Sequence, residues 1–218
     1  INRGGMASHG GMLGVLVAAW WLSRGFVDEE GRRRGACPVL HVTDAIALTA
    51  PVGLMLGRLA NFVNGELLGR IVAGPGEAAP GWSVRFPQEH LSGHAPLLTP
   101  DQSEALARLA MEHRLPNDPE LMWFEVAYER VLEKLRTGSA EASAEVAARL
   151  EPLVSARHPS QLYQAFAEGV VTLAVLWWIS RRPRLPGVVS AWFLIVYGAG
   201  RIATEFWRLP DDHFGGRG

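Results

Sequence analysis

The sequence has very little cysteine, no excess of charge of one sign, and none of the short motifs that mark nucleotide or metal enzymes. Cys37 is the single cysteine, which excludes an internal disulfide framework and a zinc site built from cysteines. The 21 basic and 22 acidic residues leave a formal net charge of −1, so no overall positive field attracts nucleic acid. The seven histidines are scattered, and no HExxH, Walker, GxSxG or GxGxxG pattern occurs. We therefore expect neither a bound metal nor a cofactor.

Long apolar stretches are what the sequence does contain. They cover about residues 4–23, 42–63, 159–179 and 187–207. Each is close to the roughly 20 residues that a helix needs to cross a bilayer. Trp20 and Trp21 lie near the end of the first stretch, where aromatic residues of the membrane interface gather. We predict an all-α, polytopic membrane protein with about four transmembrane helices. A soluble protein with apolar core helices is the alternative.

Arginine-rich segments follow the first and third apolar stretches, at residues 24–34 and 181–184. The positive-inside rule places both segments in the cytoplasm, and two crossings of the membrane separate them, so the two placements agree. The polar middle of the chain then lies outside, as a periplasmic head between the second and third helices. We predict two transmembrane helices with a basic cytoplasmic loop in residues 1–64, the head in 65–157, and two transmembrane helices with a tail in 158–218.

The predicted head contains a short strand at residues 82–86 and three amphipathic helices. The first helix begins after Thr99, in a capping box with proline at the first helical position. The second is expected over residues 118–138. Ser139 is the expected N-cap of the third, which stops before Pro152.

Four polar clusters interrupt the ends of the apolar stretches. They lie at residues 8–11, 57–66, 157–163 and 197–205. The predicted topology places all four at the same depth, on the outer side of the membrane. This convergence predicts a functional site formed by residues that are far apart in the sequence.

Arg58 and Arg201 are the cations of this predicted site. Both lie in apolar sequence, where an arginine is costly unless it has a role. A guanidinium group is planar, always charged and able to bind phosphate oxygens with two hydrogen bonds. The pair therefore predicts a phosphate clamp. The alternative is that the two side chains extend to the membrane interface or pair with Glu66 and Glu205.

The same clusters supply candidates for a general base and for headgroup binding. The candidate bases are His9, Glu66, Glu168 and Glu205. His9 is favoured because it opens a helix beside two glycines and faces the arginine clusters, although a lone histidine is often structural. The candidates for headgroup binding are Asn61, Asn64, Gln161 and Tyr163. Each of these four has an alternative role at a helix end or at the membrane interface.

The motifs in these clusters resemble those of the phosphatidylglycerol–prolipoprotein diacylglyceryl transferase family. They are SHGGMLG at 8–14, GRLANFVNGELLGR at 57–70, RHPSQLY at 157–163 and YGAGRIATEF at 197–206. The second motif is long and specific. Ala60 stands where the family usually has glycine.

The resemblance implies a fold of seven membrane helices with a periplasmic head. This chain would supply the central four helices, and its start at Ile1 also leads us to expect a fragment. The resemblance implies that Arg58 and Arg201 hold the phosphate of phosphatidylglycerol. The other residues that it makes important are His9, Asn61, Glu66, Gly69, Tyr197 and Glu205.

The implied reaction moves a diacylglyceryl group from phosphatidylglycerol to the lipobox cysteine thiol of a prolipoprotein, forming a thioether. The implied partners are phosphatidylglycerol, the lipobox peptide and membrane lipids, without nucleic acid. The implied location is the bacterial inner membrane, with the active site towards the outer leaflet. The alternative is a membrane transporter that binds a lipid or anion without chemistry.

Overall fold

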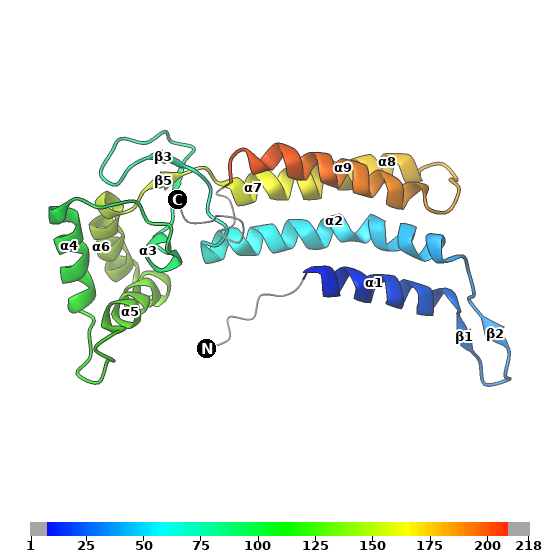
Figure 1. Cartoon of the computed structure of the whole chain (residues 1–218), viewed down its shortest axis with the longest axis horizontal. Helices are drawn as coiled ribbons and strands as arrows, with labels where there is room; N and C mark the ends of the chain where they lie inside the picture. Colours follow the sequence, from blue (N-terminus) through cyan, green and yellow to red (C-terminus); the bar gives the residue numbers. More distant parts are fainter. Residues whose placement is uncertain (1–7, 209–218) are drawn as a thin grey trace. The chain divides into compact units, whose positions relative to one another are not determined.

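The computed structural model describes residues 8–208 and is mostly helical (Figure 1). The described residues divide into two compact units. Unit 1 contains residues 8–58 and 164–203, and unit 2 contains residues 59–163 and 204–208. Most of the apolar helices belong to unit 1, and the elements of the predicted head belong to unit 2. The strands are only two or three residues long.

Unit 1 is formed mainly by long apolar helices. Its elements are α1 (Ser8–Ser23), β1 (Phe26–Val27), β2 (Arg33–Arg34), most of α2 (Val39–Asn64), the π-helix η2 (Ala165–Val171), α8 (Thr172–Ser180) and most of α9 (Val188–Glu205). Helices α2, α8 and α9 lie side by side (Figure 1). Ala47, Leu176 and Val189, one from each of these helices, form a small buried apolar cluster.

Two helices among the described residues are long and apolar enough to cross a bilayer. They are α2 and the continuous helix Ser160–Ser180, which consists of α7 (Ser160–Gln164), η2 and α8. In α2 only Ala47 and Pro51 are buried, although the helix has 26 residues. A core helix of a soluble protein would bury most of an apolar surface, so the exposed apolar side chains fit an all-α membrane protein.

The single acidic residue of the second apolar stretch has a structural role. Asp44 of α2 accepts hydrogen bonds from the backbone nitrogens of Gly187 and Ser190, each at 2.8 Å, and from Ser190 Oγ at 2.7 Å. These donors lie at the start of α9, where backbone N–H groups lack partners within the helix. Asp44 therefore caps a neighbouring helix, which explains a carboxylate in an apolar stretch.

Unit 2 contains the predicted head. Its elements are β3 (Ile71–Ala73), β4 (Val84–Arg85), α3 (Glu89–Ser92), α4 (Pro100–Met111), α5 (Trp123–Thr137), α6 (Ala140–Leu150), the 3₁₀-helix η1 (Glu151–Leu153), β5 (Ala156–Arg157) and most of α7. The three-stranded antiparallel sheet has the order β3–β5–β4.

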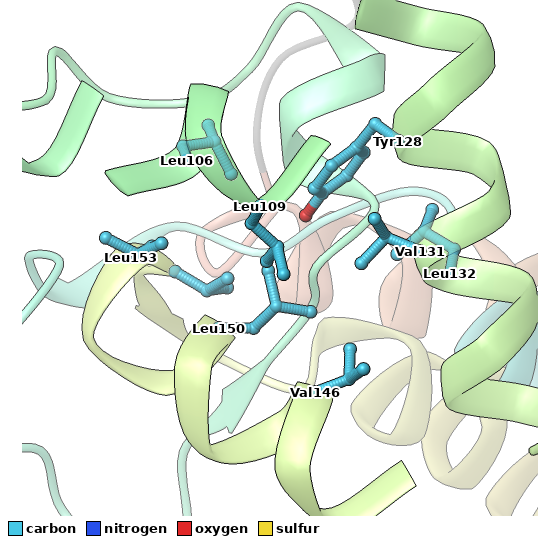
Figure 2. Close-up of a cluster of buried hydrophobic side chains, with 9 residues drawn as sticks. Leu106, Leu109, Tyr128, Val131, Leu132, Val146, Leu150 and Leu153 are labelled. Atoms are coloured by element: carbon cyan, nitrogen blue, oxygen red, sulfur yellow. The ribbon is translucent and has the colours of Figure 1, made fainter. Parts of the chain in front are cut away.

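The core of unit 2 lies between α4, α5 and α6 (Figure 2). It contains Leu106, Leu109, Tyr128, Val131, Leu132, Val146, Leu150, Leu153 and Val154. The Tyr128 hydroxyl donates a hydrogen bond to the Pro87 carbonyl at 3.0 Å, which satisfies the one polar group of this cluster. Burial raises the pKa of that hydroxyl.

Two of the three predicted helix starts in the head are confirmed. Thr99 and Gln102 form the predicted capping box, and Ser139 caps α6. The predicted start at Asp118 is wrong, because α5 begins at Trp123. Asp118 instead accepts a hydrogen bond from the Leu115 backbone and pairs with Arg130, so its side chain stabilises the loop before α5. The predicted strand at 82–86 is only two residues long, as β4.

Candidate active site

In unit 1 three charged side chains from three different helices come together. Arg58 of α2 donates to Oε2 of Glu168 from Nε at 3.2 Å and from Nη2 at 3.0 Å. Nη1 of Arg201, on α9, lies 3.7 Å from the other carboxylate oxygen, Oε1. The Glu168 side chain is fully buried, whereas 15% of the Arg58 side chain and 30% of the Arg201 side chain are exposed. The carboxylate is therefore the inner member of the cluster.

A close approach of two helices brings Arg58 to Glu168. Gly169 lies against Met55 of α2, and a Cβ at Gly169 would overlap the Met55 side chain. Met55 precedes Arg58 by one turn, and Gly169 directly follows Glu168. Glu168 and Gly169 both lie in the π-helix η2, a rare local conformation that is frequent at functional sites. Glycine at 169 therefore permits the contact on which the ion pair depends.

The structure shows Glu168, and not Glu66, as the carboxylate that pairs with Arg58. The alternative that Arg58 pairs with Glu66 is therefore wrong. Its partner lies 110 positions away in the sequence, so the sequence pattern around Arg58 could not indicate it. Two guanidinium groups thus face one buried carboxylate.

Tyr197 and His9 are the other predicted site residues of unit 1. Tyr197 lies one helical turn before Arg201 and so shares its face of α9, where its ring stacks on Phe193 with the ring centroids 5.6 Å apart. His9 lies in the first turn of α1, and its side chain is outside the part of the chain that the structure describes. Among residues 8–208 no group of three or more histidine, cysteine or acidic side chains is placed to hold a metal ion.

In unit 2 the first turn of α7 holds the loop that follows α2. Gln161 Nε2 donates to the Glu66 carbonyl at 2.6 Å, and Ser160 Oγ donates to the Leu67 carbonyl at 3.2 Å. Gln161 is fully buried, whereas Glu66 is exposed. The RHPSQLY and NGELLGR motifs are thus two parts of one loop assembly.

Gly69 belongs to the same assembly, where only glycine fits. A Cβ at this position would overlap the carbonyl oxygen of His158. The Gly69 carbonyl accepts a hydrogen bond from Nη1 of Arg157 at 3.1 Å, and Arg157 is fully buried against Glu89, with Nε 2.7 Å from the Glu89 carboxylate. The structure therefore gives Gly69 a steric role.

The remaining predicted residues of unit 2 lie at helix ends. Asn61 and Asn64 are in the last turn of α2, and the Asn61 carbonyl accepts the backbone N–H of Glu66 at 2.9 Å. Glu205 ends α9 and lies 4.0 Å from Arg208, three residues later.

The sequence analysis missed the roles of two polar residues of unit 1. Glu168 was considered only as a base, and Gln164 was not considered. The available signal was a carboxylate in an apolar stretch with no cation close in sequence, because such a charge needs a partner from another helix.

A family model matches nearly the whole chain. The family model described as prolipoprotein diacylglyceryl transferase matches residues 1–217. This chain belongs to the prolipoprotein diacylglyceryl transferase family. The resemblance predicted from the four motifs is thereby confirmed.

Several curated proteins named phosphatidylglycerol–prolipoprotein diacylglyceryl transferase are similar to this member of the family. The protein of Bdellovibrio bacteriovorus is 32% identical over 232 residues, which cover 99% of this chain and 59% of that protein. The protein of Xylella fastidiosa strain M23 is 35% identical over 211 residues, covering 96% and 54%. The protein of Ralstonia pickettii is 36% identical over 217 residues, covering 98% and 55%. The chain thus spans somewhat more than half the length of these curated relatives.

Proposed function

We propose that the protein containing this chain transfers a diacylglyceryl group from phosphatidylglycerol to the lipobox cysteine thiol of prolipoproteins. The observation that carries the proposal is the cluster of Arg58 and Arg201 around the buried carboxylate of Glu168 in a member of this family. Guanidinium groups are planar, always charged and able to bind phosphate oxygens with two hydrogen bonds, which suits a phosphodiester headgroup. The names of the curated relatives support the same two substrates.

In this proposal Arg58 and Arg201 bind the phosphate of phosphatidylglycerol. The residues that the sequence motifs propose for headgroup binding are Asn61, Asn64, Gly69, Gln161, Tyr197 and Glu205. Gln161 and Gly69 act by holding the loop after α2, as their contacts with Glu66 and His158 support.

The chemical step requires a thiolate. A thiol of pKa about 8.5 is only a few per cent ionised at pH 7, so forming the thiolate costs about 2 kcal/mol. We assign His9 or Glu66 as the base that accepts the proton. The sulfur then attacks the glyceryl carbon, the new C–S bond forms, and the C–O bond to phosphate breaks with its electron pair on the departing glycerol phosphate. Arg58 and Arg201 stabilise the charge that gathers on this leaving group, so neither a metal nor a cofactor is needed.

The proposed setting is the bacterial inner membrane. Four helices of this chain cross it, residues 65–157 form a periplasmic head, and the arginine-rich loops at 24–34 and 181–184 remain in the cytoplasm. The active site then faces the outer leaflet, where the lipid and the lipobox peptide meet. Helix α2 and the helix Ser160–Ser180 have the length and composition that this arrangement requires.

A thiol-lipidation assay tests the proposal. The full-length protein in detergent is mixed with phosphatidylglycerol labelled in its acyl chains and with a lipobox peptide, and the thioether product is measured by mass spectrometry. We expect transfer that depends on the peptide cysteine and that survives EDTA. Binding of the lipid without any thioether product would contradict the transferase and support the transporter alternative.

A further inference from the structure

Gln164 lies on a buried polar face of its helix, and its side chain has no hydrogen bond among the described residues. Three polar residues, Gln164, Glu168 and Thr172, follow one another at intervals of four, and all three are fully buried. Spacing of this kind places them on one face of the helix Ser160–Ser180. The opposite face is exposed and apolar, with Phe166 and Val170 among its residues.

Each of the other two side chains has a hydrogen bond, although Oε1 of Glu168 has none within the described part of the chain and lies 3.7 Å from Nη1 of Arg201. Glu168 accepts from Arg58 at 3.0 Å, and Thr172 Oγ1 donates to the Ala167 carbonyl of its own helix at 3.0 Å. Neither Nε2 nor Oε1 of Gln164 has a hydrogen-bond partner in residues 8–208. Most buried polar atoms in proteins are bonded, so a fully buried amide with both atoms unbonded calls for a partner from outside the described residues, such as a ligand or a water molecule.

The position of Gln164 identifies that ligand. It precedes Glu168 by one turn, on the face that Glu168 presents to Arg58 and Arg201. A carboxamide both donates and accepts, which suits a group carrying hydroxyls beside a phosphate. We propose that Gln164 is a further substrate-binding residue, whose amide bonds the phosphoglycerol headgroup held by the two arginines. This inference rests on the proposed function for the identity of the lipid.

The test replaces Gln164 by methionine, which keeps the length of the side chain and removes both hydrogen-bonding atoms. In the thiol-lipidation assay we expect the KM for phosphatidylglycerol to rise about tenfold, as for the loss of one or two hydrogen bonds. The KM for the lipobox peptide should stay unchanged. Gln164→Glu should raise the lipid KM further, because a second carboxylate repels the phosphate.

A second measurement separates binding from folding. The melting temperature Tm is recorded in detergent with and without phosphatidylglycerol, and with phosphatidylethanolamine as the comparison lipid. Gln164→Met should melt at or above the wild-type temperature without lipid, since it removes an unbonded buried amide, and phosphatidylglycerol should raise its Tm less than that of the wild type. Thr172→Val is the matched control, because Thr172 bonds its own helix, and it should respond to the lipid as the wild type does.

The outcomes for Gln164 and for the proposed function are distinct. One outcome is an active Gln164→Met enzyme that differs from the wild type by less than twofold in both its lipid KM and its lipid-dependent Tm shift. That result would overturn the role of Gln164 and leave the proposed transferase activity intact. A wild-type protein that makes no thioether would overturn the transferase. The dependence of the phosphatidylglycerol Tm shift on Gln164 would then still decide whether this residue binds the lipid.

Discussion

The carboxylate of Glu168 lies 3.0 Å from Nη2 of Arg58, although 110 residues separate them in the sequence. Breaking a buried ion pair by removing one partner is strongly destabilising, by about 3–5 kcal/mol, because the remaining charge stays buried. The pair also fixes the direction of a guanidinium group that the proposed function assigns to substrate phosphate. The proposed function therefore couples stability and substrate binding at this position.

If Arg58 and Arg201 form a phosphate clamp, activity requires their planar guanidinium groups and not only their positive charges. Arg58→Ala and Arg201→Ala should each lower diacylglyceryl transfer at least about 100-fold, as for the loss of one transition-state donor. Arg58→Lys should lower it at least about tenfold, because an ammonium group keeps the charge and loses the planar fork. Initial rates with labelled phosphatidylglycerol measure both effects.

Arg24 provides the control for the clamp. Its guanidinium group lies over the ring of Trp20, 3.8 Å from the ring centroid, and is not part of the Arg58–Glu168–Arg201 cluster. Arg24→Lys should therefore leave the rate of transfer unchanged. Transfer by Arg58→Ala near the wild-type rate would refute the clamp.

Glu168→Gln tests the carboxylate between the arginines. Without its negative charge the two partly exposed guanidinium groups lose the buried carboxylate between them, so we expect a lower Tm in detergent. Phosphatidylglycerol should raise this Tm more than it raises the wild-type Tm, because the lipid phosphate replaces the lost counter-charge. Glu125→Gln, at an exposed site on α5, is the control. Equal lipid-dependent shifts in Glu168→Gln and wild type would count against a shared site for carboxylate and phosphate.

Gly69→Ala tests the steric role of the glycine after α2. A Cβ there overlaps the His158 carbonyl, so the loop must move, at a cost of about 1–3 kcal/mol. We expect a lower Tm and a loss of transfer together. Gly81→Ala, where a Cβ meets nothing within 4 Å, should change neither. If Gly69→Ala keeps its Tm and loses only lipid affinity, Gly69 contacts the substrate directly.

The ion pair of Asp118 with Arg130 predicts how acid affects the stability of unit 2. The hydrogen bonds from Arg130 lower the pKa of Asp118 to about 2, against about 3.9 in an unfolded chain. A carboxyl with a lowered pKa stabilises the folded state above pH 4 and loses that contribution as the pH falls towards 2. At pH 4, pepsin should therefore cut the loop between α4 and α5 faster in Asp118→Asn than in wild type. The ratio of the two rates should fall as the pH drops from 4 to 2.

The matched control for this experiment is Glu120→Gln, which changes an exposed residue of the same loop. It should be cut at the wild-type rate at both pH values. A ratio of Asp118→Asn to wild-type cleavage that stays constant from pH 4 to pH 2 would contradict the role of the Asp118–Arg130 pair.

Local signals in the sequence were sufficient for most of the helices. Thr99 and Gln102 specify the start of α4 within four residues, so the capping box was predicted and is present. The prediction of a helix start at Asp118 was wrong because an aspartate before proline can either begin a helix or stabilise a loop. The partner that decides between these two roles, Arg130, lies twelve residues away. Caps are local, whereas ion pairs of this kind depend on the tertiary fold.

The sequence by itself determined the family, the apolar helices and the two arginines, since motifs, hydropathy and residue chemistry are properties of short segments. Only the tertiary structure decided which groups those arginines meet. Helix packing at Gly169 brought Glu168 to Arg58, and the burial of one helix face left the Gln164 amide without a partner among the described residues. The physical reason is that desolvation and hydrogen bonding depend on neighbours in space, which residues far apart in the chain supply.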